Sequence, residues 1–401
     1  MAELTCAAFL VLLILPQLGT DCGFLQDHAN RTIDASTRDA YERLGATLHI
    51  VNIPGAINHD AARWIDAPSI DLPVFAFRSL TGGRLPQLPS VRVSFGIDLR
   101  RSGISDSGLS ELNKKSNLRY VNLSNTLVTD DGLMELAGLK DLETLLLGKS
   151  GLERRNRESL TGRGIRHLAA LPRLRHLFLS GARIGDNELR HLGMLRHLVA
   201  LDLSDTGVTG AGLGELVVLK SLASLDLSFT QVGDNGLKAI SRLETLMWLD
   251  LSTTSGISDV GVSDLAGLQR LVGLQLCGVP ITDKGLGGVV ALKNLRVLNL
   301  QGTRITDAGV TGLSQLSRLV ELSLNSTKVG DAGIDEITGL VALESLDLGG
   351  SQISDRALRK LVGLTQLKAL DVSNTKVSRA GIDQLRKALP GCRVKQEEND
   401  P

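Results

Sequence analysis

The sequence repeats itself every 24 residues, and this period constrains the fold more than any other feature of the chain. The best preserved copy is LRVLNLQGTRITDAGVTGLSQLSR, from Leu295 to Arg318. Self-similarity at a fixed period of this length predicts a solenoid, in which one structural unit is stacked many times. Copies of the pattern begin at Ser94, Leu118, Leu142, Leu174, Leu198, Leu222, Leu246, Leu271, Leu295, Leu319, Leu343 and Leu367.

Each copy contains two different spacings of apolar residues. The first third alternates apolar and polar residues, as in Leu298-Asn299-Leu300, which predicts a short strand with its leucines inward. The last third spaces apolar residues three or four apart, which predicts a helix. At the joint most copies carry an aspartate, which we expect to cap the helix by accepting hydrogen bonds from its free N–H groups. These aspartates are Asp130, Asp186, Asp234, Asp283, Asp307, Asp331 and Asp355.

One such unit cannot bury its apolar face alone, so neighbouring units must stack and pair their strands. We therefore predict an α/β fold, a right-handed solenoid of about twelve repeats in a horseshoe or arc, with a concave parallel sheet and convex helices. Over residues 94–390 the consensus T-x-[VI]-T-D-x-G-L resembles that of bacterial leucine-rich repeat proteins. It is also distantly similar to the F-box-associated and ribonuclease-inhibitor-like repeats.

The ends of the chain do not follow the repeat. Residues 7–15, AAFLVLLIL, suit the core of a signal peptide and are too few to span a bilayer, so residues 1–23 are interpreted as a signal peptide or N-terminal anchor. The chain is then exported, as a periplasmic, secreted or membrane-associated protein, and is cytoplasmic if this segment is not a signal. Residues 24–93 are expected to form an N-terminal cap, and residues 391–401 a C-terminal cap and tail.

Local patterns refine these two caps. Ser36 to Leu44 reads as a short helix, and Thr47 to Ile53 reads as a strand that covers the open sheet edge. The rest of residues 24–93, which is rich in proline, is expected to be loop. At the other end, Ile382 to Leu389 completes a last helix and Cys392 to Val394 adds a half-strand.

One repeat is longer than the others, because eight residues are added between Leu152 and Ile165. The insert spans Glu153 to Arg163, and the surrounding stretch from Lys149 to Arg196 has a net charge of +7. Such a basic sector attracts anionic ligands, but the simpler interpretation is a solvated outer face, on which arginine stems cover apolar surface. The candidate residues for an anionic ligand are Arg154, Arg155, Arg157 and Arg163.

The concave face is the other candidate site. Residues two and four positions after each opening leucine point away from the core, and several are aromatic or apolar, as binding surfaces favour. Alternatively, these rings pack on neighbouring strands. A stacked row of aspartates is an arrangement that favours cation binding. However, the LDLS tetrad is common in repeats of this type, so no metal site is predicted. The candidates are Tyr120, Leu146, His176, Phe178, Asp202, Asp226, Phe229, Trp248 and Asp250.

Catalytic motifs are missing from the sequence, which has no G-x-S-x-G, no H-E-x-x-H and no P-loop. Basic and acidic residues balance at 44 each, so net charge gives no signature of nucleic-acid binding. We therefore predict a monomeric, non-enzymatic scaffold without cofactor or metal, which binds a protein or extended polymer on its concave face. It has no membrane span beyond a possible N-terminal anchor.

Three alternatives stay open at this point. The first is binding of an anionic ligand through the basic insert face of repeats 3–4. The second is an F-box-like ubiquitin-ligase substrate adaptor, although no F-box helices are recognisable near the N-terminus. The third is a cryptic enzyme, whose active site the sequence does not reveal.

Overall fold

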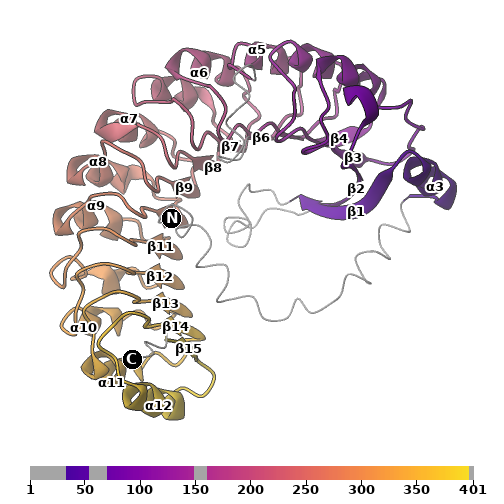
Figure 1. Ribbon diagram of the computed structural model, residues 1–401. Helices are drawn as coiled ribbons and strands as arrows, with labels where there is room; N and C mark the ends of the chain where they lie inside the picture. The colour runs from indigo at the N-terminus through magenta and orange to yellow at the C-terminus, as the bar shows by residue number, and fades with distance from the viewer. Residues whose placement is uncertain (1–32, 54–69, 149–159, 397–401) are drawn as a thin grey trace. The chain divides into compact units, whose positions relative to one another are not determined.

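The computed structural model describes residues 33–53, 70–148 and 160–396 of the chain. The chain divides into two compact units, an N-terminal unit within Gln17–Asp226 and a C-terminal unit from Leu227 onward, and each is described by itself. In both units short strands alternate with short helices along the chain. Figure 1 shows that within each unit the helices of the repeats lie on one side of the strands. The alternation predicted from the repeat is confirmed.

The strands of the N-terminal unit follow one another across the sheet in chain order. They are β1 (Ala46–Ile53), β2 (Ile70–Phe77), β3 (Phe95–Asp98), β4 (Leu118–Asn122), β5 (Thr144–Leu146), β6 (His176–Phe178), β7 (Ala200–Asp202) and β8 (Ser224–Asp226). The helices of this unit are α3 (Ala35–Arg43), α5 (Ile165–Leu168) and α6 (Asp186–Leu192), with 3-10 helices at Thr81–Gly83, Asp106–Lys114, Gly132–Leu136 and Leu213–Val218.

The C-terminal unit has the same order of elements. Its strands are β9 (Trp248–Asp250), β10 (Gly273–Gln275), β11 (Val297–Asn299), β12 (Glu321–Ser323), β13 (Ser345–Asp347), β14 (Ala369–Asp371) and β15 (Arg393–Lys395). Its helices are α7 (Gly233–Ile240), α8 (Asp259–Asp264), α9 (Leu286–Val290), α10 (Ile334–Ile337), α11 (Asp355–Leu361) and α12 (Arg379–Ala388), with 3-10 helices at Leu265–Gly267, Asp283–Gly285 and Leu313–Gln315.

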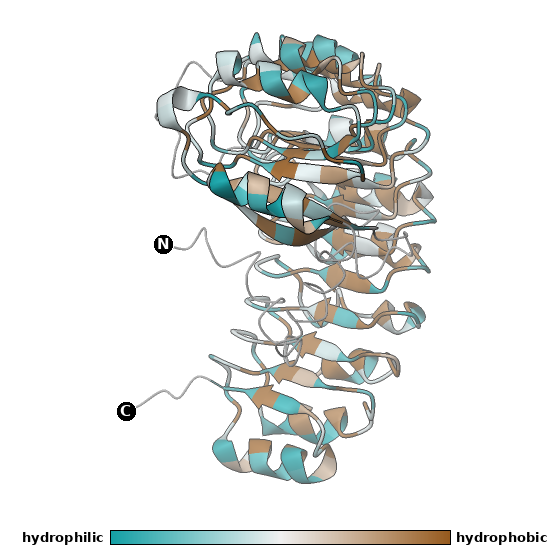
Figure 2. Ribbon diagram, turned by 90° about the vertical axis from the view of Figure 1, so that its right-hand side faces the viewer, coloured by the Kyte–Doolittle hydropathy of each residue, from teal (hydrophilic) through white to brown (hydrophobic). Residues whose placement is uncertain are grey.

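The strands of successive repeats pair in register, so equivalent side chains stack. In the C-terminal unit Leu274, Leu298 and Leu322 are paired in turn, and all three side chains are buried. The residues on either side of each leucine point to the opposite face, which we call the sheet face. Figure 2 shows hydrophobic residues on each strand, while the helices alternate between hydrophilic and hydrophobic residues. The period of 24 residues thus produces one apolar core between strands and helices.

The aspartate of each repeat bonds the next repeat and does not cap its own helix. The Oδ1 and Oδ2 atoms of Asp283 accept hydrogen bonds from the Thr306 backbone N–H at 2.8 Å and the Thr306 hydroxyl at 2.7 Å. The residue before the aspartate acts as the N-cap, since the Thr282 side chain accepts from the N–H of Lys284. The predicted capping role was therefore wrong, because the carboxylate finds two donors on the neighbouring repeat. The other predicted aspartates also accept a backbone N–H of the next repeat, and all but Asp307, whose donor is Gly330, accept a hydroxyl as well: Asp130, Asp186, Asp234, Asp307, Asp331 and Asp355.

This bond also explains the glycine of the T-D-x-G-L consensus. A Cβ atom placed on Gly309 would lie 2.2 Å from Oδ1 of Asp283, inside the contact distance of the two atoms. The carboxylate of one repeat therefore occupies the space that a side chain at this position of the next repeat would need. Glycine is required here by close approach and not by an unusual backbone conformation.

The N-terminal cap contains one strand more than predicted. The expected helix and strand are confirmed as α3 and β1, but β2 occupies a stretch that we expected to be loop. Pro73 obscured this strand in the sequence, because proline lacks the N–H that a central strand needs. In the structure Pro73 faces Ile50 of the antiparallel strand β1, and β2 pairs with β3 only from Val74 to Ala76. Stacking of the Tyr41 ring on Phe75, with centroids 3.8 Å apart, joins α3 to this cap.

The helix and the half-strand predicted near the C-terminus are both present. The helix α12 covers the last repeat, and its N-cap Ser378 accepts a hydrogen bond from the backbone N–H of Gly381. After the break at Pro390, β15 pairs in parallel with β14 as the expected half-strand.

Candidate binding face

Two rows of side chains line the sheet face of the N-terminal unit, because β5 to β8 have three residues each and the middle leucine points inward. The first residue of each strand forms one row, which we call the first row. The third and last residue of each strand forms the other, which we call the third row. Register pairing aligns the third row as Asn122, Leu146, Phe178, Asp202 and Asp226. The first row is aligned as Tyr120, Thr144, His176, Ala200 and Ser224.

In the third row an apolar pair lies directly beside an acidic pair. Leu146 is paired with Phe178, Phe178 with Asp202, and Asp202 with Asp226. All four side chains are half-buried, so part of each remains on the surface. This arrangement offers an apolar contact and a negative charge on adjacent strands.

The electrostatic state of Asp202 departs from that of an ordinary surface aspartate. Burial, followed by repulsion from Asp226, raises the pKa of Asp202 to about 7. Ser204 offsets part of this effect, since its backbone N–H donates to Oδ1 of Asp202 at 2.8 Å and its hydroxyl donates at 2.7 Å. The ionised carboxylate is thus costly to keep in the free protein, and a cation placed next to it lowers that cost.

The first row contributes less exposed surface than the sequence suggested. Tyr120 is 7% exposed and packs with Leu72 and Val74 of the cap strand β2, with Leu146 against this cluster. Burial raises the pKa of the Tyr120 phenol. His176 is 6% exposed, and its Nδ1 atom lies 2.9 Å from the Thr144 hydroxyl. Tyr120 therefore supports Leu146 of the third row, and the His176 ring is largely covered.

In the C-terminal unit the expected contacts fall in different environments. Trp248, the first residue of β9, is 1% exposed, and a Cβ atom on Gly273 would lie 2.1 Å from its ring, so the indole fills the space above that glycine. Asp250 is half-buried and accepts a hydrogen bond from the Ser252 N–H at 2.8 Å. Phe229 is 43% exposed and lies in the turn that follows β8 in the sequence. Its φ is 59°. Of these three residues, only Phe229 presents a largely exposed apolar surface.

Two of the predictions concern segments outside the described residues. These are the leader, residues 1–23, and the insert arginines Arg154, Arg155 and Arg157. The fourth insert arginine, Arg163, is described and exposed. Among residues 33–53, 70–148 and 160–396, none of the helices is long and apolar enough to cross a membrane.

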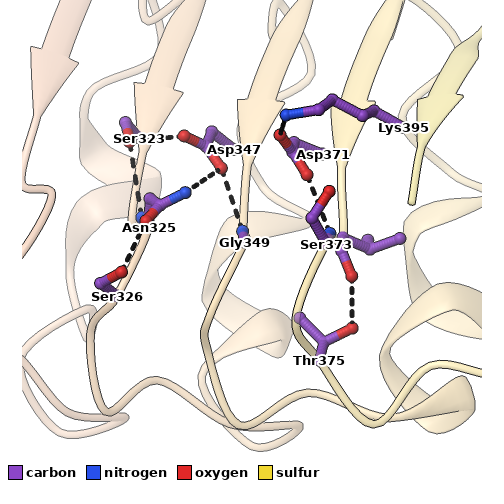
Figure 3. A network of polar contacts seen from close by, with 10 residues as sticks. Ser323, Asn325, Ser326, Asp347, Gly349, Asp371, Ser373, Thr375 and Lys395 are labelled. Carbon is purple, nitrogen blue, oxygen red and sulfur yellow. Dashed lines mark hydrogen bonds and ion pairs between the residues drawn. The ribbon is translucent and has the colours of Figure 1, made fainter. Parts of the chain in front are cut away.

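Sequence reasoning missed a polar network at the end of the C-terminal unit. Asp347 accepts hydrogen bonds from the Gly349 N–H at 3.0 Å and from the Asn325 side chain at 3.1 Å, and burial raises its pKa. The fully buried Asp371 is paired with Lys395 of β15 at 3.0 Å (Figure 3). The signal in the sequence was a lysine in the last strand at the position where the two preceding strands carry aspartate. It marks the end of the aspartate row.

The chain is similar to known proteins in both sequence and structure. The family described as Leucine Rich repeat matches residues 114–137, 195–217, 218–241 and 291–314. An internalin (inlF) of Listeria monocytogenes is similar in structure, with a TM-score of 0.60 and 20% sequence identity over 93% of this chain and 98% of that chain. A leucine-rich repeat protein of Leptospira interrogans has a TM-score of 0.49 and 20% identity over 80% of this chain and 93% of that chain. No curated protein sequence matches the chain significantly.

The four family matches fall inside the region with the 24-residue period, and the internalin shares the fold over almost the whole of both chains. Repeat solenoids present extended surfaces that commonly bind other proteins. The in-register leucines, the strand and helix in each repeat and these similarities agree. The chain is a leucine-rich repeat solenoid of the α/β class.

Proposed function

We propose that the chain is a non-enzymatic scaffold that binds a protein segment across the third row of its N-terminal unit. The observation that carries this proposal is the in-register order of Leu146, Phe178, Asp202 and Asp226, all half-buried. An apolar pair next to a carboxylate pair is complementary to a segment with an apolar side chain followed by a basic one.

The electrostatics of the carboxylate pair supports a basic partner residue. Adjacent strands lie about 4.8 Å apart, so Asp202 and Asp226 hold two like charges at close range. The raised pKa of Asp202 reflects this strain together with burial. A lysine or arginine of the partner stabilises both ionised groups and restores the charge balance of the row. The basic side chain therefore contributes to affinity and also fixes the register of the partner.

The apolar pair supplies the second half of the contact. Phe178 and Leu146 lie on adjacent strands, and the Tyr120 cluster supports Leu146 from the cap side. A supported aromatic side chain loses little freedom on binding, which is why such residues often dominate interfaces. We assign Tyr120 and His176 to this supporting role. In the C-terminal unit we propose Phe229 as an apolar contact, Asp250 as a polar contact and Trp248 as a support.

We also infer that the chain is exported. The support for this is the apolar run of residues 7–15 in the leader. Fractionation of the native host with an antibody against the chain tests it, and recovery of the intact leader in the cytoplasm rejects it.

Selection from a random peptide library displayed on phage tests the binding proposal. The full-length chain is immobilised, and peptides are enriched over several rounds. We expect the enriched sequences to combine a large apolar residue with lysine or arginine, and their binding to weaken as salt rises, because exposed charges are screened. Single synthetic peptides from the selection are then measured in solution by fluorescence anisotropy.

Three variants make this experiment specific. Phe178→Ala is expected to weaken peptide binding at least about tenfold, as truncation of an interface anchor does. Asp202→Ser is expected to remove the preference for basic residues. Met194→Ala is the matched control, because Met194 is apolar and 57% exposed but lies after α6 on the helix side. Equal binding by all three variants rejects the third row as the binding surface.

A further inference from the structure

A second site lies outside the sheet-face rows, in the turns that lead into strands β5 to β8 of the N-terminal unit. A pocket of about 450 Å³ opens there. Its volume falls in the range of small-molecule sites, which is roughly 300–1,000 Å³. The pocket is lined by Glu143, Pro172, Arg173, Arg175, His197, Val199 and Ser221.

The cations of this pocket are not fully paired. Arg173 pairs with Asp141 at 2.9 Å, and Glu143 pairs with Arg119 at 3.4 Å. Arg175 has no ion pair and no side-chain hydrogen bond with any described residue. Two guanidinium groups and one carboxylate line the pocket itself, so its lining carries one positive charge in excess.

Two further polar residues, His197 and Ser221, belong to the lining. His197 and Ser221 stand at positions equivalent to Arg173 in the next two repeats, and both are exposed. Their ring N–H and hydroxyl are hydrogen-bond donors. Donors from three successive repeats thus converge on one space.

We propose that this pocket binds a small phosphate monoester whose organic part carries hydroxyl groups. A phosphate has three terminal oxygens and up to two negative charges, so it uses the planar donors of Arg175 together with Arg173, His197 and Ser221. A carboxylate offers only two oxygens and one charge to the same donors. The phosphate therefore fits the number and charge of the donors better.

The remaining lining determines what the phosphate is attached to. Glu143 is an acceptor in the lining of the pocket, and hydroxyl groups of the ligand donate to it. Pro172 and Val199 supply apolar surface for the carbon skeleton. The volume is larger than a bare phosphate requires. A phosphorylated sugar or polyol satisfies all three features.

Phosphorus-31 NMR provides the test, with the full-length chain titrated into solutions of inorganic phosphate, glucose 6-phosphate or phenyl phosphate. These probes separate the anion alone, the hydroxylated ester and an ester without hydroxyl groups. We expect line broadening for all three, with glucose 6-phosphate bound most tightly. Glucose without phosphate is the control and is expected not to compete.

Substitutions locate the site. Arg175→Gln removes the unpaired guanidinium and is expected to weaken binding of every phosphate about tenfold, the effect of losing a charge-assisted hydrogen bond. Glu143→Gln is expected to reduce the preference for glucose 6-phosphate over phenyl phosphate. Arg163→Gln removes an exposed arginine of the insert, outside the pocket lining, and is expected to change nothing. All three side chains lie at the surface, and thermal melting checks that each variant is folded.

Several results overturn the proposal. Absence of broadening with the unmodified chain rejects it outright. Equal loss of binding in the Arg163→Gln and Arg175→Gln variants moves the anion to the insert. Equal affinity for all three probes rejects the hydroxylated ester. None of these results bears on peptide binding by the third row, so the two proposals fail separately.

Discussion

The Nζ atom of Lys395 lies 3.0 Å from Oδ2 of Asp371, so a lysine of the last strand neutralises a carboxylate that is otherwise fully buried. Removing one partner of a buried ion pair leaves the other charge buried without compensation. The free-energy cost of that unpaired charge exceeds the net stabilisation that the pair provides. We expect Lys395→Met to lower the free energy of unfolding of the C-terminal unit by about 2 kcal/mol, less than a fully buried pair because the lysine side chain is 31% exposed.

Urea denaturation followed by circular dichroism measures this change. Lys368→Met is the matched control, since Lys368 pairs with Glu344 at 2.8 Å in a more exposed setting. Exposed pairs contribute about 0–1 kcal/mol, so this variant is expected to be nearly neutral. A loss of equal size in the two variants contradicts the special role of Lys395.

The bonds between Asp283 and Thr306 predict a coupled pair of substitutions. Asp283→Ala leaves the Thr306 N–H and hydroxyl without their acceptor, and we expect a loss of about 1–3 kcal/mol. Thr306→Val removes the hydroxyl and is expected to cost less. In a double-mutant cycle the two losses are expected to be less than additive. Additive losses would show that the two residues contribute independently.

The raised pKa of Asp202 predicts that stability depends on pH. Because the folded state holds this proton more tightly than the unfolded state, its contribution to stability rises as the pH falls from above 7 toward 4, and is lost as the pH rises through the folded pKa. The slope from one such proton is at most about 1.4 kcal/mol per pH unit. Asp202→Asn is expected to remove this slope and to stabilise the protein above pH 7.

Thermal melting between pH 4 and pH 9 tests the titration of Asp202. Asp205→Asn removes the same charge from the turn after β7 and serves as the control for net charge. If both variants keep the slope of the unmodified chain, another group is responsible for it.

Replacement of Phe229, a proposed contact, is expected to increase the stability of the chain. Its φ of 59° is in the left-handed region, where the equivalent turn residues are Asn125, Asn374 and Gly302. A left-handed conformation costs a bulky residue roughly 1 kcal/mol, and asparagine and glycine pay less. We expect Phe229→Asn to stabilise the chain by about 0.5–1 kcal/mol and to weaken any partner bound by the ring.

A second variant separates backbone from side chain. Phe229→Ala removes the ring but keeps a residue that pays the same conformational cost, so it is expected to leave stability almost unchanged. If alanine stabilises as much as asparagine, the strain lies in the ring and not in the backbone.

Most of the fold was predictable because it rests on a local pattern repeated along the chain. Leu298, for example, lies three residues after one leucine and two before another, as do Leu274 and Leu322, and register pairing follows from this equal spacing. Packing of these leucines depends on the period alone. The strand β2 was missed because it belongs to no repeat and contains Pro73.

Exposure of the sheet-face rings was not predictable in the same way. Trp248 is buried because the residue beside it on the next strand is Gly273, and Tyr120 is buried because β2 supplies Leu72 and Val74. Both outcomes depend on residues more than 20 positions away in the sequence. The bond between Asp283 and Thr306 of the next repeat was not predictable for the same reason. A cap by Asp283 on its own helix was equally consistent with the sequence. Local patterns specified the elements, and neighbours across the repeats determined the surface.

The hydrogen bonds between each aspartate and the following repeat affect how such a chain can gain or lose repeats. Every acceptor finds its donor in the following repeat, 23 residues after Asp283 in the case of Thr306. Duplication or deletion of a whole 24-residue unit preserves each of these bonds. The eight residues added between Leu152 and Ile165 also leave the bond intact, since the Thr161 N–H still donates to Asp130 across 31 positions. Recombination in whole units is therefore a route by which this architecture lengthens or shortens its surface while every remaining joint stays intact.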